Sequence, residues 1–116
     1  MTITINNPNA PGINFGAINY SDTLPTGLQF VGLPVDSCFV PTSTLTSVTY
    51  SGTFLIGGFT CTLTATVKAT TAGVKLNTTS APTAVASDGV TVLTGTAAPA
   101  TLTAVANLPP VLTKTF

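Results

Sequence analysis

The sequence predicts an all-β protein, a β-sandwich of about eight or nine short strands with no helix, and three observations support this prediction. Apolar residues and threonines alternate along most of the chain, which puts them on opposite faces of extended strands. Clusters of Gly, Pro, Asn, Asp and Ser separate the alternating stretches at short intervals. No segment shows the apolar periodicity of a helix.

The clearest strand is expected at residues 59–68. Phe59, Cys61, Leu63, Ala65 and Val67 form one apolar row, and the four threonines between them form the other. Threonine suits a solvent-facing row because it is β-branched and its hydroxyl can bond to water. We therefore expect the apolar row to lie in the core and the threonine row at the surface.

The other strands of the body follow in chain order, each bounded by turn residues. Alternation predicts them at residues 1–6, 13–20, 28–31, 45–50, 74–78 and 101–105, and in a hairpin of 84–85 with 90–93. The Gly-Gly pair at 57–58 predicts the turn into the long strand, and Ser-Asp-Gly at 87–89 predicts the hairpin turn. Residues 34–41 read as irregular. The Pro-Pro pair at 109–110 breaks the chain before a last short strand at 111–116.

Charge is scarce in this chain. Only 5% of the residues are charged, against roughly 25% in ordinary soluble domains, and three lysines balance three aspartates. A nucleic-acid binder needs a basic patch and an anionic membrane surface attracts one, so both partners are excluded. A neutral surface gives no colloidal repulsion. Either Thr, Ser and Asn keep the domain soluble, or much of the surface is buried against copies of itself.

Membrane insertion is not expected either. No apolar run approaches the length of about 20 residues that a membrane-spanning helix needs. Residues 1–6 alternate like a strand and lack the basic flank and apolar core of a signal peptide. If the protein is exported, its signal is expected outside this chain, with Met1 as an internal residue.

Six motifs together carry a family resemblance. They are Thr2-Ile-Thr-Ile-Asn-Asn-Pro8, Tyr20-Ser-Asp-Thr-Leu-Pro-Thr-Gly27-Leu28, Gly57-Gly58 to Val67, Thr70-Thr-Ala-Gly73, Asn77-Thr-Thr79 and Ala100-Thr-Leu-Thr103. They cover most of the chain and resemble the conserved-repeat modules of bacterial surface proteins, immunoglobulin-like units catalogued as a domain of unknown function. In that family a strand similar to residues 112–116 begins a module, directly before the strand similar to residues 2–6. The resemblance implies a repeat cut out of phase, or a subunit whose C-terminal strand serves the next copy.

Cys38 and Cys61 are the two cysteines. One possibility is a disulfide between the irregular segment and the long strand. The alternative is that they provide a reactive thiol or half of a metal site. With no His and no third sulfur, this chain cannot complete a zinc site. We expect the disulfide, which would stabilise the fold by about 3 kcal/mol and imply an oxidising, extracellular compartment.

Catalysis and cofactors are not expected. The chain has no His and no Glu, and its three aspartates lie far apart in sequence, so it offers neither a base for a serine nucleophile nor a cluster for Ca²⁺. One covalent modification is considered, because surface domains similar to this one can carry a Lys-Asn isopeptide bond. Lys114, an asparagine such as Asn6 or Asn77, and Asp22 would supply its parts. Asp22 is equally explained as a turn residue that caps the backbone.

Glycans are a further candidate modification. Asn19 and Asn77 each begin the acceptor pattern for N-glycosylation, a pattern that arises often by chance in a threonine-rich chain. Threonines on exposed rows could carry O-linked sugars.

The function expected from these features is structural. The chain would divide into a sandwich body at 1–108 and a Pro-Pro break with a C-terminal strand at 109–116. That strand would add to the open edge of a neighbouring copy, so that units form a filament or surface array outside the cell. The donor strand is Val111, Leu112, Thr113, Lys114, Thr115 and Phe116, and the acceptor edge is Met1, Thr2, Ile3, Thr4, Ile5 and Asn6.

An adhesin-type repeat is the alternative function. Such a repeat would present its loops to a glycan or a protein. The absence of Trp and the presence of only two Tyr weaken this reading, because these residues are the usual anchors of recognition surfaces.

Overall fold

The computed structural model describes residues 1–115, and these residues fold into ten β-strands and no helix. The strands are β1 (Thr2–Asn6), β2 (Phe15–Thr23), β3 (Leu28–Asp36), β4 (Thr42–Ser43), β5 (Ser47–Leu55), β6 (Thr60–Ala69), β7 (Gly73–Thr78), β8 (Thr83–Val85), β9 (Val92–Thr94) and β10 (Pro99–Ala104). All pairings are antiparallel. The all-β prediction is therefore confirmed. Within the described chain no helix is long and apolar enough to cross a membrane.

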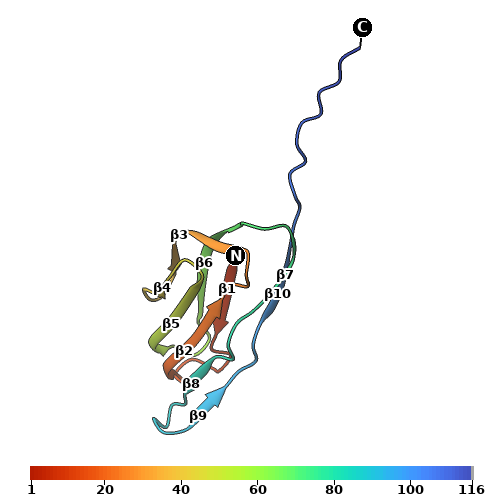
Figure 1. Cartoon of the computed structure of the whole chain (residues 1–116). Coiled ribbons are helices and arrows are strands. Elements are labelled where there is room, and N and C mark those ends of the chain that lie inside the picture. Colours follow the sequence, from red (N-terminus) through yellow and green to blue (C-terminus); the bar gives the residue numbers. More distant parts are fainter. Residues whose placement is uncertain (116) are drawn as a thin grey trace.

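Two sheets make up the body (Figure 1). One has the strand order β1-β6-β3, with β6 in its centre, and the other has the order β4-β5-β2-β8-β9. β7 and β10 form a separate two-stranded ribbon. The observed strand count slightly exceeds the predicted one because short strands such as β4 form only through their pairing partners.

The core lies between the two sheets and consists of two clusters of buried side chains. In the first, Ile18, Tyr20 and Tyr50 of the five-stranded sheet pack with Cys61 of β6. The rings of Tyr20 and Tyr50 are stacked with their centroids 4.9 Å apart. In the second cluster Leu63 is fully buried. β6 thus contributes to both clusters, and its apolar row holds the two layers together.

The apolar row of the long strand is buried as predicted, except at its first residue. Cys61 and Leu63 are fully buried, and Ala65 and Val67 are half-buried. Phe59 is 60% exposed, so the expectation for this residue was wrong. β6 begins only at Thr60, and Phe59 belongs to the preceding turn, where its N–H donates to the carbonyl of Ile56 at 3.1 Å.

Residues 34–41 were expected to be irregular, and the structure corrects this for the first three of them. β3 continues to Asp36 because it pairs with β6 a second time. After a shift in register between Val31 and Val35, Val35 lies opposite Thr64. A pairing partner, not the local sequence, sets the end of this strand.

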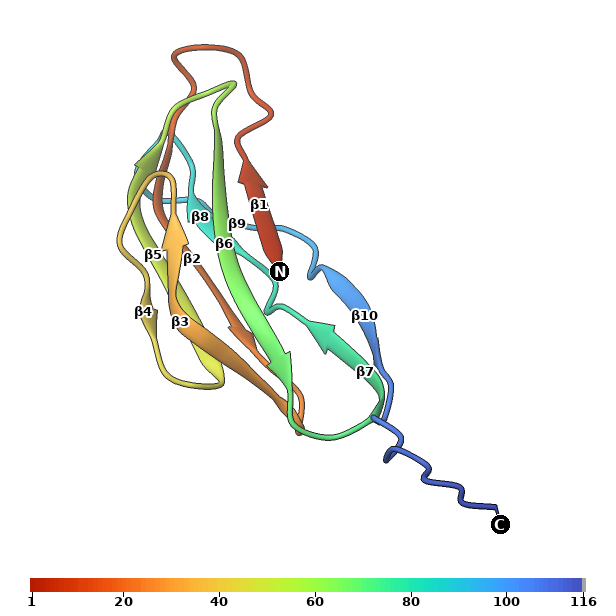
Figure 2. The same ribbon diagram turned by 90° about the horizontal axis from the view of Figure 1, so that it is seen from above.

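β7 to β10 form one long hairpin, with β8 and β9 at its tip and β7 and β10 at its base (Figure 2). At the base Thr78 pairs with Pro99, and at the tip Thr83 pairs with Thr94. Thr83 is five positions after Thr78, and Thr94 is five positions before Pro99, so the two halves of the hairpin share one register. The predicted turn forms the tip. There the Thr91 hydroxyl and the N–H groups of Val90 and Thr91 donate to Asp88, which lowers the pKa of Asp88 to about 2.

The tail beyond β10 leads away from the body (Figure 1). Residues 105–115 contain no strand and are exposed. The expected strand at 111–116 is therefore not formed by residues 111–115 of a single chain, because a lone strand has no partner for its N–H and C=O groups. Phe116 lies outside the described residues. The pairing of this segment with a neighbouring unit stays a prediction.

Candidate functional site

β1 is an edge strand whose second side is open. On one side it pairs with β6, from Thr2 opposite Thr64 to Asn6 opposite Thr60. The N-terminal ammonium extends this ladder by donating to the carbonyl of Ala65 at 2.7 Å. On its other side β1 pairs with no strand among residues 1–115. The residues expected as the acceptor edge thus lie on an edge whose backbone groups can pair with an added strand.

Asn7 anchors the end of β1. Its side chain is buried, and its amide donates to the carbonyls of Ile13 and Leu55, both at 2.9 Å. Its Oδ1 accepts from the backbone N–H and the side-chain amide of Asn9. The sequence places this residue only in one of the clusters of turn residues that separate the predicted strands. Asn7 joins three segments partly through the carbonyl of Leu55, which is 48 positions away in sequence, and no local signal reveals that contact.

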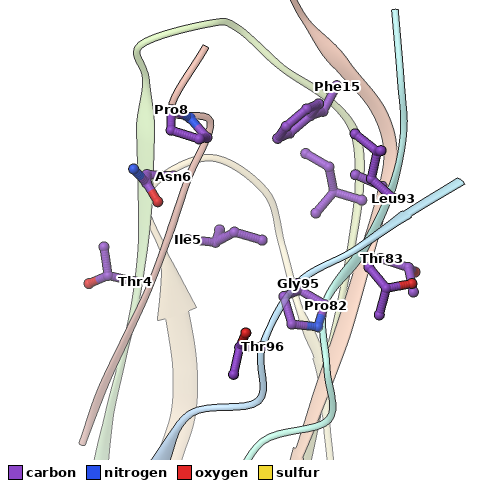
Figure 3. A pocket seen from close by; sticks show the side chains of 13 residues that line it. Thr4, Ile5, Asn6, Pro8, Phe15, Pro82, Thr83, Leu93, Gly95 and Thr96 are labelled. Carbon is purple, nitrogen blue, oxygen red and sulfur yellow. The ribbon is translucent and has the colours of Figure 1, made fainter.

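A cavity of about 400 Å³ lies between the open side of β1 and the tip of the long hairpin (Figure 3). Ile5 points into it from β1, and Phe15, Leu93 and Pro82 face it from the other elements. Its lining is Thr4, Ile5, Asn6, Pro8, Phe15, Ile18, Pro82, Thr83, Ala84, Leu93, Thr94, Gly95 and Thr96.

Two further cavities continue along the same edge. A small one of about 50 Å³ shares Thr4, Ile5 and Pro82 with the first. The other, of about 250 Å³, lies at the start of β1 and is lined by Met1, Leu24, Leu28, Val67, Lys75, Asn77, Ala100, Thr101 and Leu102. The three cavities follow β1 along its length, between β1 and the hairpin. We call this row of cavities the edge groove.

The edge groove has many apolar residues in its lining, and its lining reaches from Met1 to Asn6. Ile5 and Phe15 contribute to one end and Leu28, Val67 and Leu102 to the other. Strand addition requires an open ladder together with pockets for alternate side chains. β1 has the open ladder, and the cavities of the edge groove lie beside it.

A buried carboxylate contacts Asn77, which lines the cavity at the start of β1. Asp22, on β2, is 1% exposed. The side-chain amide of Asn77 on β7 donates to both of its carboxylate oxygens at 2.8 Å. The Oδ1 atom of Asn77 is buried and has no hydrogen-bond partner in the described chain. The same amide nitrogen lies 4.0 Å from the sulfur of Met1, so the pair faces the start of β1.

The structure brings together only part of the set of residues considered for an isopeptide bond. Asp22 and Asn77 are in contact. Asn6 is exposed at the opposite end of β1, and Lys114 lies in the tail. Within one described chain these residues therefore do not assemble into a reactive site.

Asn19 and Asn77 differ in their access to a glycan. Asn19 is exposed on β2, where its Oδ1 accepts from the Ser51 hydroxyl at 2.6 Å and its amide donates to the Ala17 carbonyl. Asn77 is half-buried and its amide is engaged with Asp22. Asn19 is thus the more accessible of the two acceptor patterns.

Cys38 and Cys61 form the predicted disulfide, with their Cα atoms 5.6 Å apart. Neither is a free thiol. Asp36 holds the backbone at the bridge, because its Oδ1 accepts from the N–H groups of Cys38 and Phe39 at 2.7 and 3.1 Å. The bridge joins the irregular segment after β3 to the central strand of the β1-β6-β3 sheet.

Two tyrosines lie in the core beside this segment. Burial, with a smaller contribution from the charge of Asp36, raises the pKa of Tyr50 to about 12. Burial and the same carboxylate also raise the pKa of Tyr20. Both hydroxyls are buried and have no hydrogen-bond partner in the part of the chain that the structure describes. Both side chains therefore favour the neutral phenol.

Comparison with protein families finds a match. The family Domain of unknown function (DUF7933) matches residues 1–104, which is the chain up to the last residue of β10. Comparison with curated proteins and with solved structures finds no match.

Proposed function

The chain belongs to the family Domain of unknown function (DUF7933), and we propose that it is a structural module that assembles head to tail by β-strand addition. In this proposal, residues 109–116 of one unit pair with the open side of β1 in the next. The edge groove beside β1 is the observation that carries the proposal, because a free ladder flanked by apolar cavities along its whole length is what an added strand requires.

The tail has the properties of a donor strand. Leu112 is 96% exposed and Val111 is 88% exposed in the single chain. Burying one such side chain in a groove stabilises an assembly by about 1.5 to 3 kcal/mol. Pro109 and Pro110 favour an extended backbone, which keeps the donor segment clear of its own body.

The contact between tail and edge groove joins two different surfaces of the molecule. Such a heterologous contact leaves one free tail and one free groove in every dimer, so it propagates instead of closing. The same contact serves separate subunits or consecutive units of one polypeptide. The nearly uncharged surface, which offers no repulsion between copies, supports association.

The finer architecture and the location are part of the proposal. The body would be an immunoglobulin-like sandwich in which the added strand extends the β1-β6-β3 sheet beyond β1. The two packed layers support this architecture. The disulfide supports an oxidising compartment, and we place the assembly at the cell surface or in a secreted fibre. The resemblance to bacterial surface repeats agrees with this location.

Deletion of residues 109–116 tests strand addition. The full chain is expected to form filaments in electron microscopy, and the truncated chain is expected to remain monomeric by light scattering with an unchanged circular-dichroism spectrum. The matched control is Leu112→Asp, which keeps the length of the tail but places a charge on its apolar row. Filaments formed equally well by the truncated chain would contradict the proposal.

A binding repeat is the second candidate function. It is favoured by apolar side chains that are exposed on and after β3, namely Leu33, Val40 and Leu45. Exposed apolar side chains can mark a recognition site. Retention of a cell-wall glycan or a protein ligand by the truncated monomer, lost in a variant with all three residues changed to Ser, would support this candidate.

A further inference from the structure

We propose that the added strand is held on both of its sides, because a second open ladder lies across the edge groove from β1. This ladder is the outer edge of β9, β10 and the residues between them, which we call the second limb of the long hairpin (residues 92–104). The inference rests on the proposed function, since it names the backbone groups that receive the donor strand. It makes the β7–β10 ribbon a part of the acceptor.

Hydrogen bonds at both ends of β1 show which of its backbone groups point to its open side. The N–H of Asn7 donates to the carbonyl of Phe59 at 3.0 Å, and the N–H of Ala65 donates to the carbonyl of Met1 at 2.9 Å. In an antiparallel ladder, residues that bond to the partner strand alternate with residues whose N–H and C=O groups point away from it. The residues of β1 whose backbone groups point away from β6 are therefore Thr2, Thr4 and Asn6.

The second limb shows the same alternation. In its tip half the N–H of Gly95 donates to the carbonyl of Pro82 at 2.8 Å, and at its base the carbonyl of Ala98 accepts from the N–H of Thr79 at 3.1 Å. Residues at odd spacings from these bonded positions direct their N–H and C=O groups outward. The outward residues at the two ends of the limb include Thr94 and Thr101.

Pro99 agrees with this pattern. It is the first residue of β10 and lies two positions before Thr101, so its nitrogen also points away from β7. Proline is tolerated in a strand where its nitrogen faces away from the partner strand. The outer edge of β10 is thus a true edge, with donors and acceptors that its own sheet does not use.

The edge groove separates the two ladders along its length (Figure 3). Asn6 and Thr94 line its wide cavity, and Met1 and Thr101 line the cavity at its other end. From Asn6 back to Met1 the opposite wall therefore runs forward in sequence. A strand that lies between two such walls is antiparallel to one of them and parallel to the other.

The course of the tail decides the direction of the donor strand. The tail continues from β10 and leads away from the body beyond the end of the groove that Met1 lines (Figure 2). If a tail entered the next unit at its Met1 end, that unit would be turned around and its own tail would point back to the first. Entry at the Asn6 end keeps all units in one direction. The donor strand then runs antiparallel to β1 and parallel to β10.

A strand in this position joins the ribbon to the β1-β6-β3 sheet. The resulting strand order is β3-β6-β1-donor-β10-β7. Leu102, which lines the groove and is 44% exposed in the single chain, becomes covered by the donor strand. A two-stranded ribbon alone is marginal, whereas three or more strands with a covered face are stable. Assembly therefore orders the ribbon as well as connecting the units.

Hydrogen exchange at single amides tests the two-sided contact. Filaments of the full chain, and monomers diluted below the concentration at which filaments form, are exchanged in heavy water, dissolved in dimethyl sulfoxide and read by NMR. Exchange is expected to slow at least about tenfold in the filaments at both ladders. The reporting amides are Thr2, Thr4 and Asn6 on β1, and Thr94 and Thr101 on the second limb. The amide of Leu76, which lies opposite Thr101 and points to the other edge of the ribbon, is the internal control.

The two ladders separate the failure of this inference from the failure of the proposed function. Slower exchange on β1 alone would overturn the second ladder and leave strand addition intact. Slower exchange on neither ladder, or on the second limb alone, would overturn both, because the proposed function requires pairing with β1.

A proline variant tests the second ladder independently. Thr101→Pro removes one outward N–H from β10, as Pro99 already does, and should raise the monomer concentration in equilibrium with filaments about fivefold through the loss of one hydrogen bond. Leu76→Pro is the matched control, because it removes an N–H from the opposite edge of the same ribbon, and should leave that concentration unchanged. Unaltered exchange at the Leu102 amide of each monomer shows that the ribbon still forms. Equal concentrations for the two variants would overturn the pairing with β10.

Discussion

The body and the β7–β10 ribbon are built from the same alternation of aliphatic and polar residues, yet they bury opposite rows. In β6 the apolar residues Cys61 and Leu63 are inside. In β7 the aliphatic Leu76 is 62% exposed, whereas the polar Lys75 and Asn77 are half-buried. Alternation thus specifies that a strand forms. It does not specify which row is covered, because that depends on the layer that packs against the strand.

The two regions also differ in what supports them. Each sheet of the body packs against the other, and the disulfide and the stacked tyrosines lie between or beside them. The ribbon has two strands, and a two-stranded ribbon alone is marginal in water. It continues the register of β8 and β9, which are fixed to the body through β2. The ordered structure of the ribbon therefore depends on the body. The outward-facing row of its side chains is available to a partner.

The largest difference between the regions is expected from matched leucine truncations. Leu63→Ala removes a fully buried side chain and should lower the free energy of unfolding by about 3 to 5 kcal/mol. Leu76→Ala removes an exposed one and should change it by less than about 0.5 kcal/mol. Urea unfolding of the monomer measures both. Equal losses would show that the outer row of the ribbon is covered within one chain.

The disulfide is expected to have the next largest effect, and it acts on the body alone. Changing Cys38 and Cys61 together to Ala should lower the free energy of unfolding by about 3 kcal/mol, because the bridge restricts the unfolded chain. Reduction of the disulfide in the native protein is the control and should lower the free energy of unfolding by a similar amount. A double variant as stable as the native chain would show that sheet packing alone holds the segment after β3.

The smallest effect is expected in the pH dependence of the free energy of unfolding, which arises from the core tyrosines. Both tyrosines of the chain lie in the body. The pKa of Tyr50 rises from 10.0 to about 12 on folding, so the folded state keeps a proton that the unfolded state loses. The resulting stability is fully present below pH 10 and is lost as the pH rises toward 12. Urea unfolding between about pH 8 and pH 11 should show the decline, and Tyr50→Phe should reduce its slope. An equal slope in this variant would assign the decline to other groups.

The sequence by itself determined the features that depend on neighbours along the chain. The all-β class and the two rows of residues 59–68 follow from the period of two in side-chain direction, and the hairpin tip at 87–89 follows from turn chemistry. The disulfide followed from elimination, since two cysteines in a chain without histidine have few other uses. These inferences needed no knowledge of which strands lie side by side.

The tertiary structure alone decided the features that join distant parts of the chain. Asp22 and Asn77 are 55 positions apart (77 − 22), and neither carries a local signal for the other. The edge groove exists because the long hairpin lies opposite the unpaired side of β1, and the second half of β3 exists because β6 pairs with it again. Burial and hydrogen bonding are satisfied by whichever groups packing brings together, so such contacts are fixed only when the whole chain has folded.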